Sequence, residues 1–357
     1  MTKKKLFEYR KIIISVFAIA LAVFSVIYFS KECSNGIKNG ISFCVEVLLP
    51  SLFLFMVISS YIVEIGVADL LTAPFSIITN SLFRLPGCCM SAIVLSIIGG
   101  YPIGAKCTSS LFENKMITQK QAKKLSLFAV GAGPGFLINY VGFALLNNKN
   151  AGNILLISQS VSVVLCGIIA GHTIKSEDYS TTSIKKAPTT KSNAFVNSVR
   201  SACSQSALMC SMVVVFSAII EIAKTIFWGN EKVCDIITGL LEITTGCNTM
   251  CGKYPLTLIG FMIGFSGICV HFQVFSIIKE IRTNKLLFFL FRIISGIITA
   301  LTTYILLMLM PQSIEVFSTT TTKPAVSTST TVWGSASLLL SGLCFLGSIN
   351  YAENKEK

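Results

Sequence analysis

The chain has 357 residues, of which 53% are hydrophobic and only 13% are charged, with a mean hydropathy of +0.74. A soluble domain usually carries about 25% charged residues, and several apolar runs here approach the roughly 20 residues that a helix needs to cross a bilayer. This composition excludes a soluble globular protein, and the lack of dominant short alternating segments disfavours a β-barrel.

The net charge of +13 could indicate a nucleic-acid partner, but the basic residues cluster between the apolar runs. Cytoplasmic loops of multispanning proteins are rich in Lys and Arg, so we assign the charge to topology and expect no nucleic-acid partner. Most of the 13 cysteines lie inside apolar runs, where Cys behaves as a small apolar residue. Cys247 and Cys251 lack a second ligand pair or a nearby His, so we expect no metal and no other cofactor.

The N-terminal part of the chain predicts two spans. Residues 12–30 form an apolar run after a basic N-terminus and predict an uncleaved anchor, in a first unit of residues 1–34 whose N-terminus is cytoplasmic. Residues 41–65 predict a second span, kinked at Pro50.

Residues 99–106, GGYPIGAK, predict a break at the end of the next apolar run. Gly100 and Gly104 lack side chains, and Pro102 removes a backbone donor. A broken backbone is tolerated in a bilayer only where it is buried in protein or lines a wet cavity. A full crossing would place the five lysines of residues 106–124 outside, so we predict a re-entrant hairpin that turns at residues 99–102.

The rest of the chain predicts a linker, a second re-entrant segment and further spans. The Ser/Thr/Lys-rich residues 176–195 predict a cytoplasmic linker between a first repeat, residues 35–175, and a second repeat, residues 196–311. Residues 236–246 predict the second re-entrant segment, and residues 312–357 an external Ser/Thr-rich loop and a last span. The remaining spans are predicted at residues 125–146, 154–172, 199–222, 256–278, 286–310 and 332–349.

The two halves resemble each other weakly. Residues 52–65 resemble residues 209–222, and in each half a re-entrant segment and a Gly-interrupted span follow in the same order. The predicted orientations of the copies are opposite, which is typical of secondary transporters with a site at the bilayer midplane. Chance similarity between apolar helices is the alternative. We therefore expect an all-α polytopic membrane protein with about eight transmembrane helices and two re-entrant hairpins in an inverted-topology repeat.

Three motifs bring a family resemblance: GYPIGAK at residues 100–106, LEITTG at 241–246 and GFSGICVHFQ at 264–273. They resemble the sporulation integral membrane proteins of the Gate, or nucleoside-recognition-domain, group, over roughly residues 35–310. That group includes the dipicolinate transporter of endospore-forming bacteria. The resemblance implies transport of a small, anionic, dipicolinate-like metabolite across a bacterial cell membrane during sporulation, with the mother-cell-derived membrane around the forespore as one candidate location. The chain departs from the group's pattern at Ser266, where a Gly is expected, and at residues 130–132, where Asn-type residues are expected.

Ionisable groups inside a bilayer are costly, so each is a candidate for function. Glu242 is predicted to bind a coupling proton or cation, or the substrate. The alternative is that it is an interfacial residue at a helix end. His271 predicts a proton relay or a substrate contact, and the alternative is a packed polar residue. Lys106 could attract an anion or act as a cytoplasmic anchor. The predicted substrate-binding residues are Gly100, Tyr101, Pro102, Gly104, Lys106, Gly133, Pro134, Gly135, Asn139, Glu242, Thr244, Thr245, Ser266, Gly267, His271 and Gln273.

The sequence has no P-loop, so we do not expect this chain itself to pump solute with ATP. It also has no His-Glu-x-x-His and no Gly-x-Ser-x-Gly, and we expect a transporter and not an enzyme. The alternatives are a membrane scaffold for spore assembly that transports nothing, a nucleoside transporter of the same group, and, more weakly, an intramembrane enzyme. The expected partners are a small-molecule substrate and membrane lipid, with a homo-oligomer as an open alternative.

Overall fold

The computed structural model describes residues 3–65, 76–174, 193–227 and 229–310, and every regular element in these ranges is a helix. Four of these helices are long and apolar enough to cross a membrane, or five if one bent pair counts as a single span. This supports a multi-pass helical membrane protein. The predicted linker lies almost entirely outside the described residues, as do the predicted external loop and last span.

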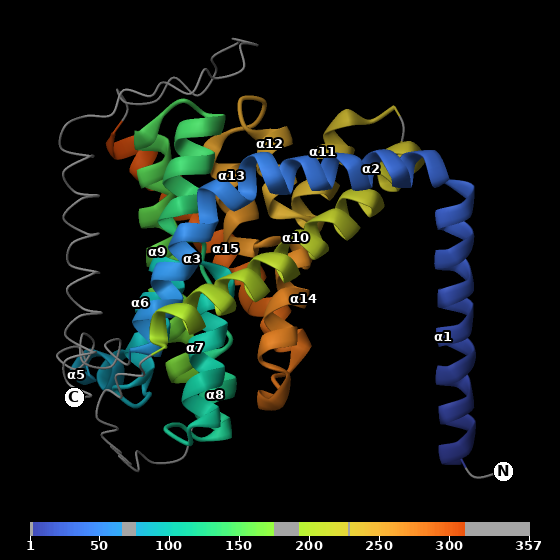
Figure 1. Cartoon of the computed structure of the whole chain (residues 1–357). Helices are drawn as coiled ribbons and strands as arrows, with labels where there is room; N and C mark the ends of the chain where they lie inside the picture. Colours follow the sequence, from blue (N-terminus) through green and yellow to red (C-terminus); the bar gives the residue numbers. More distant parts are fainter. Residues whose placement is uncertain (1–2, 66–75, 175–192, 228, 311–357) are drawn as a thin grey trace.

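The N-terminal helices turn sharply. α1 (Lys3–Tyr28) stands apart from the other helices, and its axis makes an angle of 87° with that of α2 (Ser30–Phe43) (Figure 1). A π-helical turn, Cys44–Leu48, joins α2 to α3 (Leu49–Glu64). Pro50 has no N–H and clashes with the carbonyl four residues before it, which explains a wider turn at this point.

The first helical hairpin consists of α6 (Cys89–Gly99) and α7 (Tyr101–Glu113), and it follows the short helices Ser76–Ile78 (α5) and Thr79–Phe83. The two helices are separated by one residue, Gly100, which has φ +90° and ψ −177°. Only glycine adopts such a backbone readily. A Cβ at Gly104 would lie 2.5 Å from the Ser96 Cβ, so the two arms contact each other backbone to backbone.

An interrupted crossing follows the first hairpin. α8 (Gln119–Leu125) starts at a capping box, in which the Thr118 side chain accepts from the backbone of Gln121 while the Gln121 side chain accepts from that of Thr118. Residues 126–133 are not helical, and a π-helix, Gly135–Leu145, completes the crossing. α9 (Lys149–Thr173) then starts at Asn148, whose side chain accepts two backbone N–H groups.

The second half contains a similar series of elements. α10 (Ala194–Ile226) precedes a second helical hairpin, formed by α11 (Glu231–Leu241) and α12 (Ile243–Met250). A crossing interrupted at Ser266 follows, made of α13 (Leu256–Phe265) and α14 (Gly267–Ile277). After a 3-10 turn, Lys279–Ile281, α15 (Lys285–Leu309) starts at Asn284, which caps it as Asn148 caps α9.

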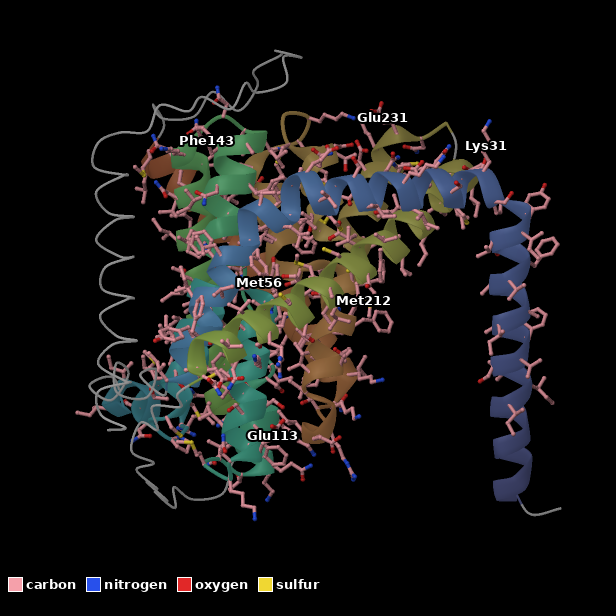
Figure 2. The ribbon with its side chains drawn as sticks, viewed as in Figure 1. Lys31, Met56, Glu113, Phe143, Met212 and Glu231 are labelled. Atoms are coloured by element: carbon pink, nitrogen blue, oxygen red, sulfur yellow. The ribbon has the colours of Figure 1, made fainter. Side chains whose placement is uncertain are left out.

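Helices from the two halves pack in pairs. The Ser162 hydroxyl on α9 lies 2.8 Å from that of Ser295 on α15, and α10 lies along α2 and α3. Figure 1 places the first hairpin in the lower half of the bundle and the second in the upper half. Glu113, which ends α7, lies near the lower edge, whereas Glu231, which begins α11, lies near the upper edge (Figure 2). The hairpins therefore open towards opposite ends of the bundle.

Candidate functional site

The tip of each hairpin contacts the interrupted crossing of its own half. A Cβ at Gly133 would lie 2.9 Å from the Ile98 carbonyl oxygen and 3.0 Å from the Gly100 nitrogen. A Cβ at Gly267, where φ is +71°, would lie 3.0 Å from the Ile243 nitrogen. Backbone is thus packed on backbone at both tips, which requires residues without side chains.

A central cavity of about 70 Å³ lies between the two tips. Eight of the predicted site residues line it: Gly100, Tyr101, Pro102, Gly133, Gly135, Glu242, Thr244 and Gln273. Apolar residues from α3, α6, α10, α12, α14 and the π-helix Gly135–Leu145 form the rest of the wall. In pockets that hold small molecules, a mostly apolar wall with a few convergent polar groups is the usual arrangement.

Glu242 caps the N-terminus of α12 from inside the protein. Its side chain is buried, and its Oε1 accepts hydrogen bonds from the Thr244 backbone nitrogen at 2.9 Å and the Thr244 hydroxyl at 2.8 Å. Its Oε2 accepts from the Thr245 nitrogen at 2.6 Å. A carboxylate at a helix N-terminus is stabilised by the helix dipole as well as by these bonds.

The N-terminus of α7 lacks such a side chain. Gly100 occupies its N-cap position and makes no side-chain cap hydrogen bond. The two half-helices therefore begin at the same cavity, one with a carboxylate of the protein and the other without. The dipole of such an N-terminus attracts anions, but at α7 Pro102 has no N–H and the Ile103 N–H donates to the Gly100 carbonyl at 3.2 Å.

Tyr101 connects the first hairpin to the broken helix of the second half. Its buried hydroxyl donates to the Ile263 carbonyl at 2.9 Å, in the last turn of α13. The last carbonyls of a helix have no partner within that helix, so Tyr101 satisfies one of them.

Replacing Tyr101 with Phe should lower the free energy of unfolding by about 1–2 kcal/mol, because the Ile263 carbonyl loses a buried donor while the ring is kept. Thermal unfolding in detergent measures this change. Tyr140→Phe is the matched control, because the Tyr140 hydroxyl is 3.5 Å from its acceptor, the Thr244 carbonyl. Equal effects of the two substitutions would contradict this account of the Tyr101 hydroxyl.

His271 caps the same helix break. Its Nε2 lies 2.9 Å from the Phe265 carbonyl, which can only accept, so Nε2 is the donor. The rings of Phe265, Phe288 and Phe289 pack edge-on against the imidazole. His271 does not line the central cavity, and this geometry favours the packed polar alternative over a proton relay.

For the transport that the sequence predicts, His271→Gln should give an uptake profile from pH 5.5 to 8 with the same shape as that of the unchanged chain, because a capping residue does not need to titrate. His271→Leu removes the donor, and we expect it to lower the unfolding temperature. An inflection near neutral pH that disappears in the Gln variant would show instead that His271 transfers a proton during transport.

The other predicted residues lie around the cavity or away from it. Gly104 and Gly267 allow close packing, and the Ser266 hydroxyl lies 3.4 Å from the carbonyls of Ile263 and Gly264. Ser266 has φ +78°, a region that favours Gly, the residue expected there. Pro134 is half-buried and Asn139 is exposed, so Asn139 does not belong to this site. The Thr245 nitrogen contacts Glu242, and Lys106 lines a neighbouring cavity.

Arg292 supports the site, although the sequence analysis predicts no role for it there. It is fully buried on α15, where Nη1 donates to the Val130 carbonyl at 2.6 Å and Nη2 to the Leu127 carbonyl at 3.1 Å. These carbonyls belong to the non-helical stretch of the first crossing. Its position inside an apolar run is the signal that could have identified it.

The resembling segments of the two halves line the cavity at equivalent positions. Leu52 and Met56 on α3 are 157 residues before Met209 and Val213 on α10, and all four side chains line the cavity. Figure 2 shows Met56 and Met212 on these helices near the middle of the bundle. The similarity of the two segments is visible in the sequence, but it does not identify these wall residues.

Ionic contacts outside the bundle centre close the opening of the second hairpin. Lys253, in the loop after α12, lies 2.7 Å from the Glu231 carboxylate and 3.6 Å from that of Asp235. The hydrogen bond to Glu231 raises the pKa of Lys253. Among the described residues, no three His, Cys, Asp or Glu side chains gather as a metal site requires.

These features define a multi-pass helical membrane protein with a small cavity between two helical hairpins. The chain is similar to a protein of Bacillus subtilis (strain 168) that is named sporulation integral membrane protein YlbJ. The two are 21% identical over 317 residues, which cover 77% of this chain and 78% of the relative. No protein-family model matches the chain, and no solved structure matches it.

Proposed function

We propose that the chain is a membrane transporter that moves a small, anionic, dipicolinate-like metabolite across a bacterial membrane during sporulation. The observation that supports this most strongly is the convergence of four helix breaks, at Gly100, residues 126–133, Glu242 and Ser266, with the central cavity between the hairpin tips. Non-helical backbone at membrane depth is expected only where it is buried or lines a cavity. Transporters place their substrate sites at such breaks.

The proposal includes an inverted repeat. Each half contains, in the same order, a wall helix, a helical hairpin, an interrupted crossing and an Asn-capped helix. The two hairpins open towards opposite ends of the bundle (Figure 2). Both are then re-entrant, the first from the cytoplasm and the second from outside.

The difference between the two half-helix N-termini supports an anionic substrate. At α12 the Glu242 carboxylate accepts the N-terminal hydrogen bonds, and at α7 no side chain does. The corresponding donors are not available at α7, because Pro102 has no N–H and the Ile103 N–H donates to the Gly100 carbonyl at 3.2 Å. The dipole of α7 is therefore what would attract a substrate carboxylate in the cavity. The sporulation role rests on the name of the B. subtilis relative, and the choice of dipicolinate rests on the resemblance of the three motifs.

The cavity is smaller than the roughly 300–1,000 Å³ of pockets that hold small molecules. The proposed transport therefore requires the cavity to widen when substrate binds. Movement of one hairpin away from its interrupted crossing would open the cavity to one side, and movement of the other would open it to the opposite side.

Uptake into proteoliposomes tests the proposed function. A panel of labelled dipicolinate, uridine and a neutral sugar should give saturable uptake of dipicolinate alone. Uptake of uridine alone would instead favour the nucleoside transporter. No uptake of any solute, together with a co-purifying protein partner, would favour the membrane scaffold.

A further inference from the structure

A second cavity, of about 590 Å³, lies between α7, the first turns of α10 and the end of α14. Two of its wall residues, Pro102 and Gln273, also line the central cavity. The two spaces are therefore neighbours, and the tip of the first hairpin contributes to both walls. We call this second space the vestibule.

The vestibule is lined by cations and hydrogen-bond donors. Lys106 comes from the first half of the chain and Arg200 from the second. The Lys106 ammonium donates to the Ser201 hydroxyl, and the Gln205 amide nitrogen also lies 2.9 Å from that hydroxyl. Among the residues that the structure describes, no carboxylate lines this cavity, although Glu64 on α3 is close enough to interact electrostatically with Lys106.

This set of groups fits a small anion. A guanidinium binds a carboxylate or phosphate through two parallel hydrogen bonds, and an ammonium adds a compact charge. The chain already holds the Lys106 side chain in place through Ser201 and Gln205. An arriving anion would therefore meet a partly ordered site, which reduces the entropic cost of binding.

We propose that the vestibule binds the anionic group, carboxylate or phosphate, of a small metabolite before it enters the central cavity. This inference rests on the proposed transport function for its role as an entry site. Pro102 belongs to the hairpin tip and to both walls, so movement of the first hairpin would join the two spaces. Lys106 and Arg200 then select anions at the entrance, and the α7 N-terminus receives them inside.

The test is equilibrium binding of labelled dipicolinate to the full-length chain in detergent. Lys106→Met and Arg200→Gln should each weaken binding by about tenfold, the effect of losing one charge-assisted contact. Lys106→Arg should restore most of the affinity, which separates loss of charge from misfolding. Lys279→Gln is the matched control, because Lys279 is 75% exposed and lies outside the cavity. In proteoliposomes, the first two variants should raise KM by the same factor and leave kcat unchanged.

Two competition experiments identify the source of the anion. Inorganic phosphate should compete with dipicolinate if the site recognises the charge of a soluble ligand. Displacement by phosphatidylglycerol nanodiscs, but not by phosphatidylcholine nanodiscs, would assign the site to a lipid headgroup and overturn the entry role. Unchanged affinity in Lys106→Met and Arg200→Gln, or no binding of either anion to the unchanged chain, would overturn the anion site. Binding with the expected variant effects but no uptake would leave the anion site standing and contradict the proposed transport.

Discussion

Replacing Glu242 with Gln should slow uptake of the substrate by about 30- to 100-fold while the protein remains folded in the membrane. The carboxylate accepts three hydrogen bonds at the start of α12. A Gln side chain of the same shape would direct an amide N–H₂ group at either the Thr244 or the Thr245 nitrogen, both of which are donors. The lost charge-assisted contact is worth about 2–3 kcal/mol, and it loosens the tip of the second hairpin at the cavity wall.

The measurement is the initial rate of dipicolinate uptake into proteoliposomes with matched protein content. Glu221→Gln is the control, because it is the same substitution at a residue away from the cavity. Glu221 lies on α10, where it forms a partly exposed ion pair with Lys224. A Glu242→Gln variant that is stably inserted and transports as fast as the Glu221→Gln control would show that the site does not depend on this cap.

Replacing Arg292 with Met should lower the free energy of unfolding by about 2–4 kcal/mol, because two buried carbonyls lose their donors at once. These are the carbonyls of Leu127 and Val130, which lie in the non-helical stretch of the first crossing. Burying the guanidinium charge is itself costly, and its removal offsets part of the loss. The net effect remains unfavourable, since Met leaves both acceptors unsatisfied.

Thermal unfolding in detergent measures the effect, which should lower the midpoint by roughly 5–15 °C. Arg292→Lys should lower the midpoint by about half as much, because an ammonium cannot donate to both carbonyls as the planar guanidinium does. Lys285→Met, an exposed change near the start of the same helix, should have little effect. An Arg292→Met midpoint equal to that of the control would show that the non-helical stretch is held by other contacts.

The helix breaks at the two hairpin tips could be predicted from the sequence. Gly100 and Pro102 disfavour a continuous helix, and the polar residues from Glu242 to Thr245 interrupt an apolar run. Such signals are local, so they can be recognised without knowledge of the tertiary structure. The same holds for Asn148 and Asn284, each of which accepts two backbone N–H groups in the first turn of the helix that follows it.

The contacts that hold the breaks together could not be predicted. Tyr101 and its acceptor on Ile263 are 162 residues apart, as are Arg292 and Val130. Nothing in the local sequence specifies such pairs. Arg292 also resembles a cytoplasmic anchor when basic residues are counted along the chain, whereas the structure buries it completely. The sequence similarly gives no reason to separate exposed Asn139 from the buried polar residues near it.

In the proposed transport, the cavity between the two hairpins carries solute from one side of a membrane to the other. Counterflow tests this most directly: proteoliposomes preloaded with unlabelled dipicolinate are diluted into a trace of labelled dipicolinate. An alternating-access carrier should accumulate label transiently above its equilibrium level, and Glu242→Gln should reduce that overshoot. Label that never exceeds the level in protein-free liposomes would contradict transport by this chain.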